Sequence, residues 1–138
     1  MTRASSAARA ALDACQADGY RVSVAVVDRH GVMRVQLHGD GAGPHTLSSS
    51  AGKAFTAASM RRSTAEYAGL IADKPALGGL RDMDERLLFL AGGLPIRFDG
   101  EVVAGIGVGG APGGDLDEAC ARAGLEAIGA EVGESGER

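Results

Sequence analysis

Alternating and continuous apolar runs in the second half of the chain predict a β-hairpin. Two apolar, β-branched segments, Leu94–Phe98 and Glu101–Val108, flank the dipeptide Asp99–Gly100. Asp-Gly tolerates the positive φ angles that a two-residue hairpin turn requires. We therefore expect two antiparallel strands joined by this turn.

A second hairpin is expected near the start of the chain. Residues 22–27 are almost continuously apolar, which is typical of a strand buried on both faces. The polar turn at 28–31 then returns the chain into another apolar segment at 32–37. A short apolar run at 87–91 predicts a fifth strand, which would lead into Gly92.

Helical periodicity and capping residues predict four helices between and around these strands. Residues 5–18 and 51–61 repeat apolar positions every three to four residues, and Ser48, Ser49 and Ser50 can cap the second of these. Ser63 and Glu66 form a capping box for a short helix that ends before Pro75. Asp115 and Glu118 mark the start of the last helix, and residues 75–85 are expected to form a loop.

Two hairpins and few strand–helix–strand crossovers predict the α+β class, with an antiparallel sheet of about five strands and helices packed on it. At 138 residues, 45% of them apolar, the chain is expected to be a single domain. Its core would span about residues 5–130, and residues 131–138 would be a frayed tail.

Composition narrows the possible functions. A net charge of −4 and a pI near 5.3 argue against nucleic-acid binding. The first residues contain no apolar run of signal-peptide or membrane-spanning length, so we expect no membrane contact and a cytoplasmic location. Cys15 and Cys120 lie in helical segments, and the sequence favours reduced, buried thiols over a disulfide or a metal pair.

The helix predicted at 51–61 has two different faces. Ala51, Ala54, Phe55 and Ala58 form an apolar stripe that we expect to meet the core. The opposite stripe, which includes Lys53 and Thr56, is neither fully polar nor fully apolar and is expected to line a pocket or a subunit contact.

Glycines 105, 107 and 110 match the pattern GxGxxG, but they alternate with apolar residues inside a strand. A dinucleotide site needs this motif at a turn from a strand into a helix, so nucleotide binding is disfavoured. The glycines instead predict a sheet face without side chains, against which a helix or a flat ligand lies close.

Several segments together resemble the GlcG/HbpS-like heme-binding family. They are GGLPI, DGEVVAGIGVGGAPGGDLDEACARAG, VSVAVVDRHGVMRVQLHGDGA and KAFTAA, and the likeness covers roughly residues 8–129. The resemblance implies the family's fold, heme as cofactor, assembly into dimers or higher closed oligomers, and a role in heme or iron handling, redox sensing or heme degradation. This chain has His38 where relatives commonly have arginine.

If the resemblance extends to heme, the loop 38–46, the Lys53/Thr56 helix face and the GGLPI segment would form the pocket. His38 or His45 could then ligate iron, because a neutral imidazole suits it. Lys53 and Arg81 are candidates to hold a heme propionate or another small anion. The full set of candidate binding residues is His38, His45, Lys53, Thr56, Arg81, Gly93 and Pro95.

Each of these candidates also has a simpler interpretation. Both histidines could be solvated loop residues, and Lys53 and Arg81 ordinary surface cations. Asp40 with the two histidines could hold a metal ion, but no third histidine or cysteine lies nearby in sequence, and we expect no metal site. Two other functions stay open: a cofactor-free enzyme that uses His45 as acid or base on a small polar metabolite, and a scaffold that binds a partner protein.

Overall fold

The computed structural model describes residues 2–132 as four α-helices, one 3-10 helix and four strands. In chain order they are α1 (Thr2–Ala17), β1 (Ser23–Asp28), β2 (Met33–His38), α2 (His45–Met60), α3 (Thr64–Asp73), η1 (Pro75–Asp82), β3 (Gly93–Phe98), β4 (Glu101–Gly109) and α4 (Gly114–Ala127). None of the helices within this part of the chain combines the length and the hydropathy needed to cross a bilayer.

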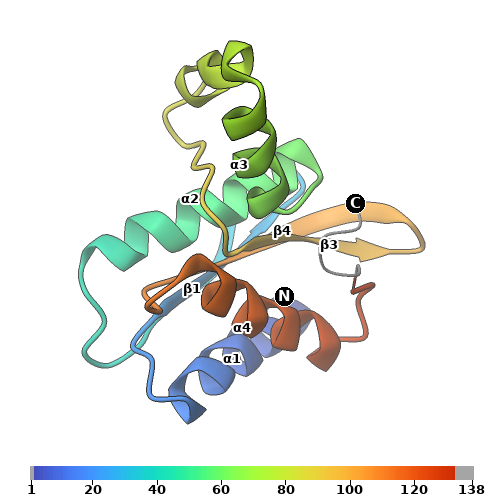
Figure 1. Cartoon of the computed structure of the whole chain (residues 1–138). Helices are drawn as coiled ribbons and strands as arrows, with labels where there is room; N and C mark the ends of the chain where they lie inside the picture. The colour runs from blue at the N-terminus through green and yellow to red at the C-terminus, as the bar shows by residue number, and fades with distance from the viewer. Residues whose placement is uncertain (1, 133–138) are drawn as a thin grey trace.

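The strands form one antiparallel sheet in the order β2-β1-β4-β3. Helix α2 covers one face, and α1 and α4 lie side by side on the other (Figure 1). Helix α3 and η1 pack against each other and project away from the sheet (Figure 1). The α+β class and the antiparallel sheet are therefore as expected, with four strands instead of five.

Both predicted hairpins are present. Asp99 and Gly100 join β3 to β4 with φ angles of 53° and 77°, the left-handed conformation that an Asp-Gly turn tolerates. The capping box of α3 is confirmed in part, since the Ser63 hydroxyl accepts a hydrogen bond from the Glu66 N–H at 3.1 Å.

The expected fifth strand at residues 87–91 is absent. This segment crosses the outside of α2, and the Leu88 N–H donates to the Thr56 hydroxyl at 2.7 Å instead of to a neighbouring strand. Leu88 therefore packs on α2 and the Phe89 ring on Tyr67 of α3, while Leu90 is exposed. The region 75–85, expected to be loop, begins with η1 because Pro75 is well suited to the first turn of a helix.

Helix α2 differs from the prediction in length and in orientation. It begins at His45, about six residues earlier than expected, and Pro44 occupies the N-cap position. Its buried positions include Lys53 and Ala57, while Phe55 is only partly buried. The stripe that we expected to line a pocket or a subunit contact is therefore largely buried within the fold, and part of the stripe assigned to the core faces outward.

Glycines in β4 explain why α2 packs close to the sheet. A β-carbon at Gly107 would lie 2.5 Å from the Ala54 backbone nitrogen, and one at Gly105 would lie 2.8 Å from the Ala58 nitrogen. The helix backbone therefore occupies the space above the bare strand. The alternative in which a flat ligand lies on these glycines is wrong for this structure.

Gly107→Ala is expected to destabilise the protein by about 1–3 kcal/mol, because its methyl group would push α2 off the sheet. Gly69→Ala is the matched control, since a β-carbon there meets nothing within 4 Å in the interior of α3. That change is expected to stabilise by about 0.5–1 kcal/mol. Urea denaturation measures the free energy of unfolding of both variants. Equal changes in the two variants would contradict the close packing of α2 on β4.

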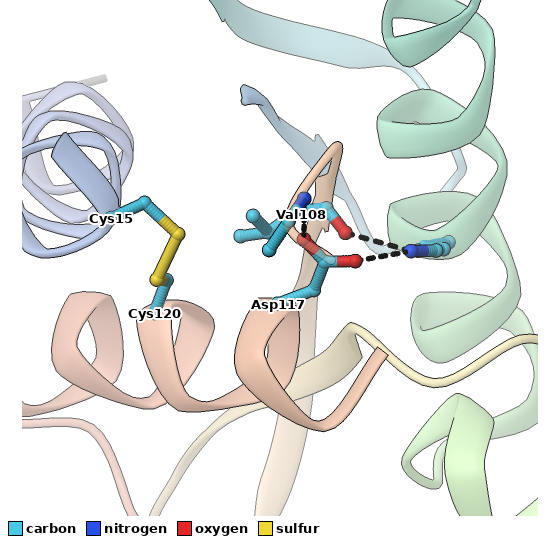
Figure 2. The surroundings of a disulfide bond; sticks show 6 residues. Cys15, Val108, Asp117 and Cys120 are labelled. Atoms are coloured by element: carbon cyan, nitrogen blue, oxygen red, sulfur yellow. Dashed lines mark hydrogen bonds and ion pairs between the residues drawn. A yellow bond between two sulfur atoms is a disulfide. The ribbon is translucent and has the colours of Figure 1, made fainter. Parts of the chain in front are cut away.

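A disulfide joins the two helices on the far face of the sheet. Cys15 on α1 and Cys120 on α4 are bonded across a sequence separation of 105 residues, and both are buried (Figure 2). The prediction of reduced thiols is therefore wrong. The helices come from opposite ends of the chain and pack side by side, which brings together two cysteines whose sequence positions give no sign of contact.

The frayed tail was expected to begin at Glu131, and for this residue the prediction is wrong. Glu131 is held by the β3–β4 hairpin: its N–H donates to the Arg97 carbonyl at 3.0 Å, and its carboxylate accepts the Gly100 N–H at 2.7 Å. Residues 133–138 lie outside the described part of the chain.

Candidate functional site

Four of the expected binding residues are buried parts of the fold. Lys53 is 5% exposed, and its ammonium donates to the Val108 carbonyl at 2.9 Å and to the Asp117 carboxylate at 3.1 Å. The Asp117 carboxylate on α4 and the Val108 carbonyl on β4 both point toward α2 (Figure 2). The anion contact expected of Lys53 is thus made inside the protein, with Asp117.

Asp117 connects α4 to the rest of the fold. Its second oxygen accepts the Ala111 N–H at 2.9 Å, so both carboxylate oxygens have a partner. Burial raises the pKa of the Asp117 carboxyl, while the Ala111 N–H and the Lys53 ammonium act in the opposite direction. Asp117 was not among the expected site residues; Lys53, between Gly52 and Ala54 on a core-packed helix, would have been the signal that a buried carboxylate was needed.

Thr56, Gly93 and Pro95 also serve the fold. The Thr56 hydroxyl donates to the Gly52 carbonyl at 2.7 Å and accepts the Leu88 N–H. The Gly93 N–H donates to the Thr64 hydroxyl at 2.9 Å, and Pro95 is buried in edge strand β3, where its missing N–H costs no ladder bond.

Arg81 is exposed and lies in η1, on the projection formed with α3 (Figure 1). The two candidate histidines lie at the beginning of α2 and at the end of β2. The structure therefore does not gather the predicted residues into one pocket. His38, Asp40 and His45 do not form a metal-binding group within residues 2–132.

His38 is anchored by a chain of buried hydroxyls. Its Nδ1 lies 2.6 Å from the Ser23 hydroxyl, which lies 2.8 Å from the Thr46 hydroxyl, which donates to the Gly43 carbonyl at 2.6 Å. Ser23 and Thr46 are almost fully buried, whereas the His38 side chain is exposed.

The direction of each hydrogen bond in this series of hydroxyls follows from its last acceptor, the Gly43 carbonyl. A carbonyl oxygen carries no proton, so Thr46 must donate to Gly43, and Ser23 must then donate to Thr46. Nδ1 of His38 must therefore carry the proton that it shares with Ser23. In the neutral ring, the free lone pair is on Nε2. His45, by contrast, is exposed at the first residue of α2, and no protein hydrogen bond to its ring is present among the described residues.

An open hollow of about 370 Å³ lies on the outward side of α2. Its walls come from the β1–β2 hairpin, from α2 and from the segment 85–88 that crosses the helix. This volume falls within the range of small-molecule sites. The lining is Val27, Gly31, Met33, Ser48, Ala51, Gly52, Phe55, Glu85, Arg86, Leu87 and Leu88.

Aliphatic, thioether and aromatic side chains dominate this lining, and the charged groups come from segment 85–88. The Arg86 guanidinium carbon lies 4.3 Å from the centroid of the Phe55 ring, a cation–π contact. The hollow therefore combines an apolar surface with one basic side chain, Arg86, and one acidic side chain, Glu85. Phe55 was expected in the core, and Arg86 was not among the expected binding residues.

The fold is an α+β domain with an open hollow beside α2, and comparison with known proteins identifies its family. A family model described as haem degrading protein HbpS-like matches residues 1–126, so the chain belongs to the HbpS-like family. This confirms the resemblance stated from the sequence. No curated protein gives a significant match.

Solved structures agree with this assignment. A double mutant of HbpS from Streptomyces reticuli is 53% identical, with a TM-score of 0.85, and the match covers 91% of this chain and 83% of that one. The Klebsiella pneumoniae protein ORFY is 26% identical, with a TM-score of 0.88 over 95% of this chain and 90% of that one. PduOC, crystallised in complex with heme, is 25% identical, with a TM-score of 0.88 over 97% of both chains.

Proposed function

We propose that this chain binds heme in the hollow between α2 and segment 85–88. The observation that carries the proposal is the apolar lining of a 370 Å³ hollow around Phe55. Membership of a family described as haem degrading, and the heme complex of the related PduOC, support the choice of ligand. Bound heme would supply an iron centre for redox or oxygen chemistry.

The lining residues fit such a group. Phe55 and Leu88 would contact the macrocycle, and Met33 offers a thioether, a type of side chain that serves as an axial iron ligand in some heme proteins. His38 and His45 do not line the hollow. The proposal therefore moves the heme from the predicted 38–46 loop to the outward side of α2.

Hemin titration followed by the Soret band tests the location. Ala51→Trp places a large ring in the hollow and is expected to weaken hemin binding at least tenfold. Ala72→Trp, at an exposed position of α3, is the matched control and is expected to bind like the wild type. Unchanged binding by Ala51→Trp would overturn the hollow as the heme site.

Histidine variants separate this site from the one expected from the sequence. In the hollow, hemin should give the same spectrum with His38→Ala and His45→Ala as with the wild type. A Soret band displaced by either variant, with Ala51→Trp unaffected, would place the heme beside the end of β2 and the beginning of α2, where Nε2 of His38 offers a free lone pair.

Self-association and location are further parts of the proposal. Met83 and Leu90 are large apolar residues with 60% and 56% exposure, on either side of segment 85–88, and a second copy of the chain would bury them. Light scattering of the purified protein gives its mass and therefore the number of copies that associate.

The sequence predicted a cytoplasmic location. The Cys15–Cys120 disulfide instead favours an oxidising compartment.

A further inference from the structure

Arg86 is held in one orientation by its neighbours. Its Nε and Nη2 donate to the two oxygens of Asp84 at 3.0 and 2.7 Å, a bidentate pair. Asp84 also accepts the Arg86 backbone N–H at 2.9 Å. Together with the Phe55 ring beneath the guanidinium, these contacts orient a side chain that is 62% exposed.

This arrangement leaves part of the guanidinium available. An arginine carries five N–H donors, and Asp84 takes one from Nε and one from Nη2. The remaining three donors lie along the other edges of a group that lines the hollow. The Arg86 hydrogen bonds lower the pKa of Asp84 to about 2, so Asp84 is ionised at neutral pH.

Other cations are poorly placed for a ligand in this hollow. Lys53 is committed to Asp117, and Arg81 does not contribute to the lining. Glu85 is the acidic group of the lining and acts against the binding of an anion there. Within the hollow, Arg86 is therefore the group that can recognise a negative charge.

We propose that Arg86, positioned by Asp84 and Phe55, is the carboxylate anchor of the hollow, so that the site selects flat apolar molecules with a carboxylate at one edge. This inference rests on the proposed heme function and specifies which chemical feature of the ligand is read. It transfers to Arg86 the anion contact that the sequence suggested for Lys53 and Arg81.

The test compares hemin with hemin dimethyl ester, in which both carboxylates are blocked, in the same dilute detergent. Arg86→Gln is expected to raise the apparent Kd for hemin about tenfold and to leave the Kd for the ester within about twofold of the wild type. Glu85→Gln is expected to tighten hemin binding and to leave the ester unaffected. Arg62→Gln is the matched control, since Arg62 also lies over an aromatic ring, that of Tyr67, but not in the hollow.

The outcomes distinguish the two proposals. If Arg86→Gln weakens hemin and ester equally, Arg86 only packs against the ligand and the anchor is wrong, while the heme site stands. If Arg86→Gln changes neither, the anchor is also wrong. If the wild-type protein binds neither compound, the proposed function itself fails. Asp84→Asn adds a positioning test: it should weaken hemin less than Arg86→Gln does and should again spare the ester.

Discussion

Reduction of the Cys15–Cys120 disulfide is expected to lower the free energy of unfolding by about 4–5 kcal/mol. The bond closes a loop of 105 residues, and chain-entropy estimates give about 4.7 kcal/mol for a closed loop of about 100 residues. This is a large part of the 5–15 kcal/mol by which natural domains are typically stable. The reduced protein should therefore unfold at a markedly lower urea concentration.

Urea denaturation with and without a thiol reductant measures this effect. Because both cysteines are buried, reduction should be verified by thiol titration of the unfolded sample. The double variant Cys15→Ala/Cys120→Ala is the control, since reductant should not change its midpoint. A wild-type midpoint that stays the same after verified reduction would contradict the prediction.

Lys53→Met is expected to cost about 3–5 kcal/mol of stability. The change leaves the buried Asp117 carboxylate without its cation, and breaking a buried ion pair from one side typically costs this much. Lys74→Met, at an exposed position, is the matched control and should stay within about 0.5 kcal/mol of the wild type.

A second variant distinguishes the lost pair from lost packing. Lys53→Met/Asp117→Leu removes both charges and should recover most of the stability lost in the single variant, because apolar replacements of buried pairs are often close to neutral. Denaturant unfolding of the three variants gives the comparison. If the free energy of unfolding of Lys53→Met lies within about 1 kcal/mol of the wild type, the Lys53–Asp117 ion pair contributes little to stability.

The strands were predictable because their signals are local. Asp99 and Gly100 define a turn by their own backbone preferences, and the apolar runs beside them could form only a hairpin. The fifth strand was wrong because an apolar run of five residues does not reveal whether it pairs with a strand or packs on a helix. For residues 87–91 the partner is α2, through Thr56.

The candidate site was harder to predict because it depends on pairs that are distant in the sequence. Lys53 looked like a surface cation until α4 placed Asp117 beside it. The bare glycines of β4 suited a ligand or a helix equally well, and the choice was made by the backbone of α2. Phe55 was assigned to the core by periodicity alone, although the buried side of α2 was rotated from the expected one by the close packing on β4.

The burial of Lys53 has a practical consequence for labelling. The chain has two lysines, and the ammonium of one of them is enclosed by Asp117 and Val108. An amine-reactive dye should therefore modify the folded protein at Lys74, next to η1, and at the N-terminal amine. A fluorophore at Lys74 would sit on the projection formed by α3 and η1, where it could report on the approach of a second molecule without touching the sheet.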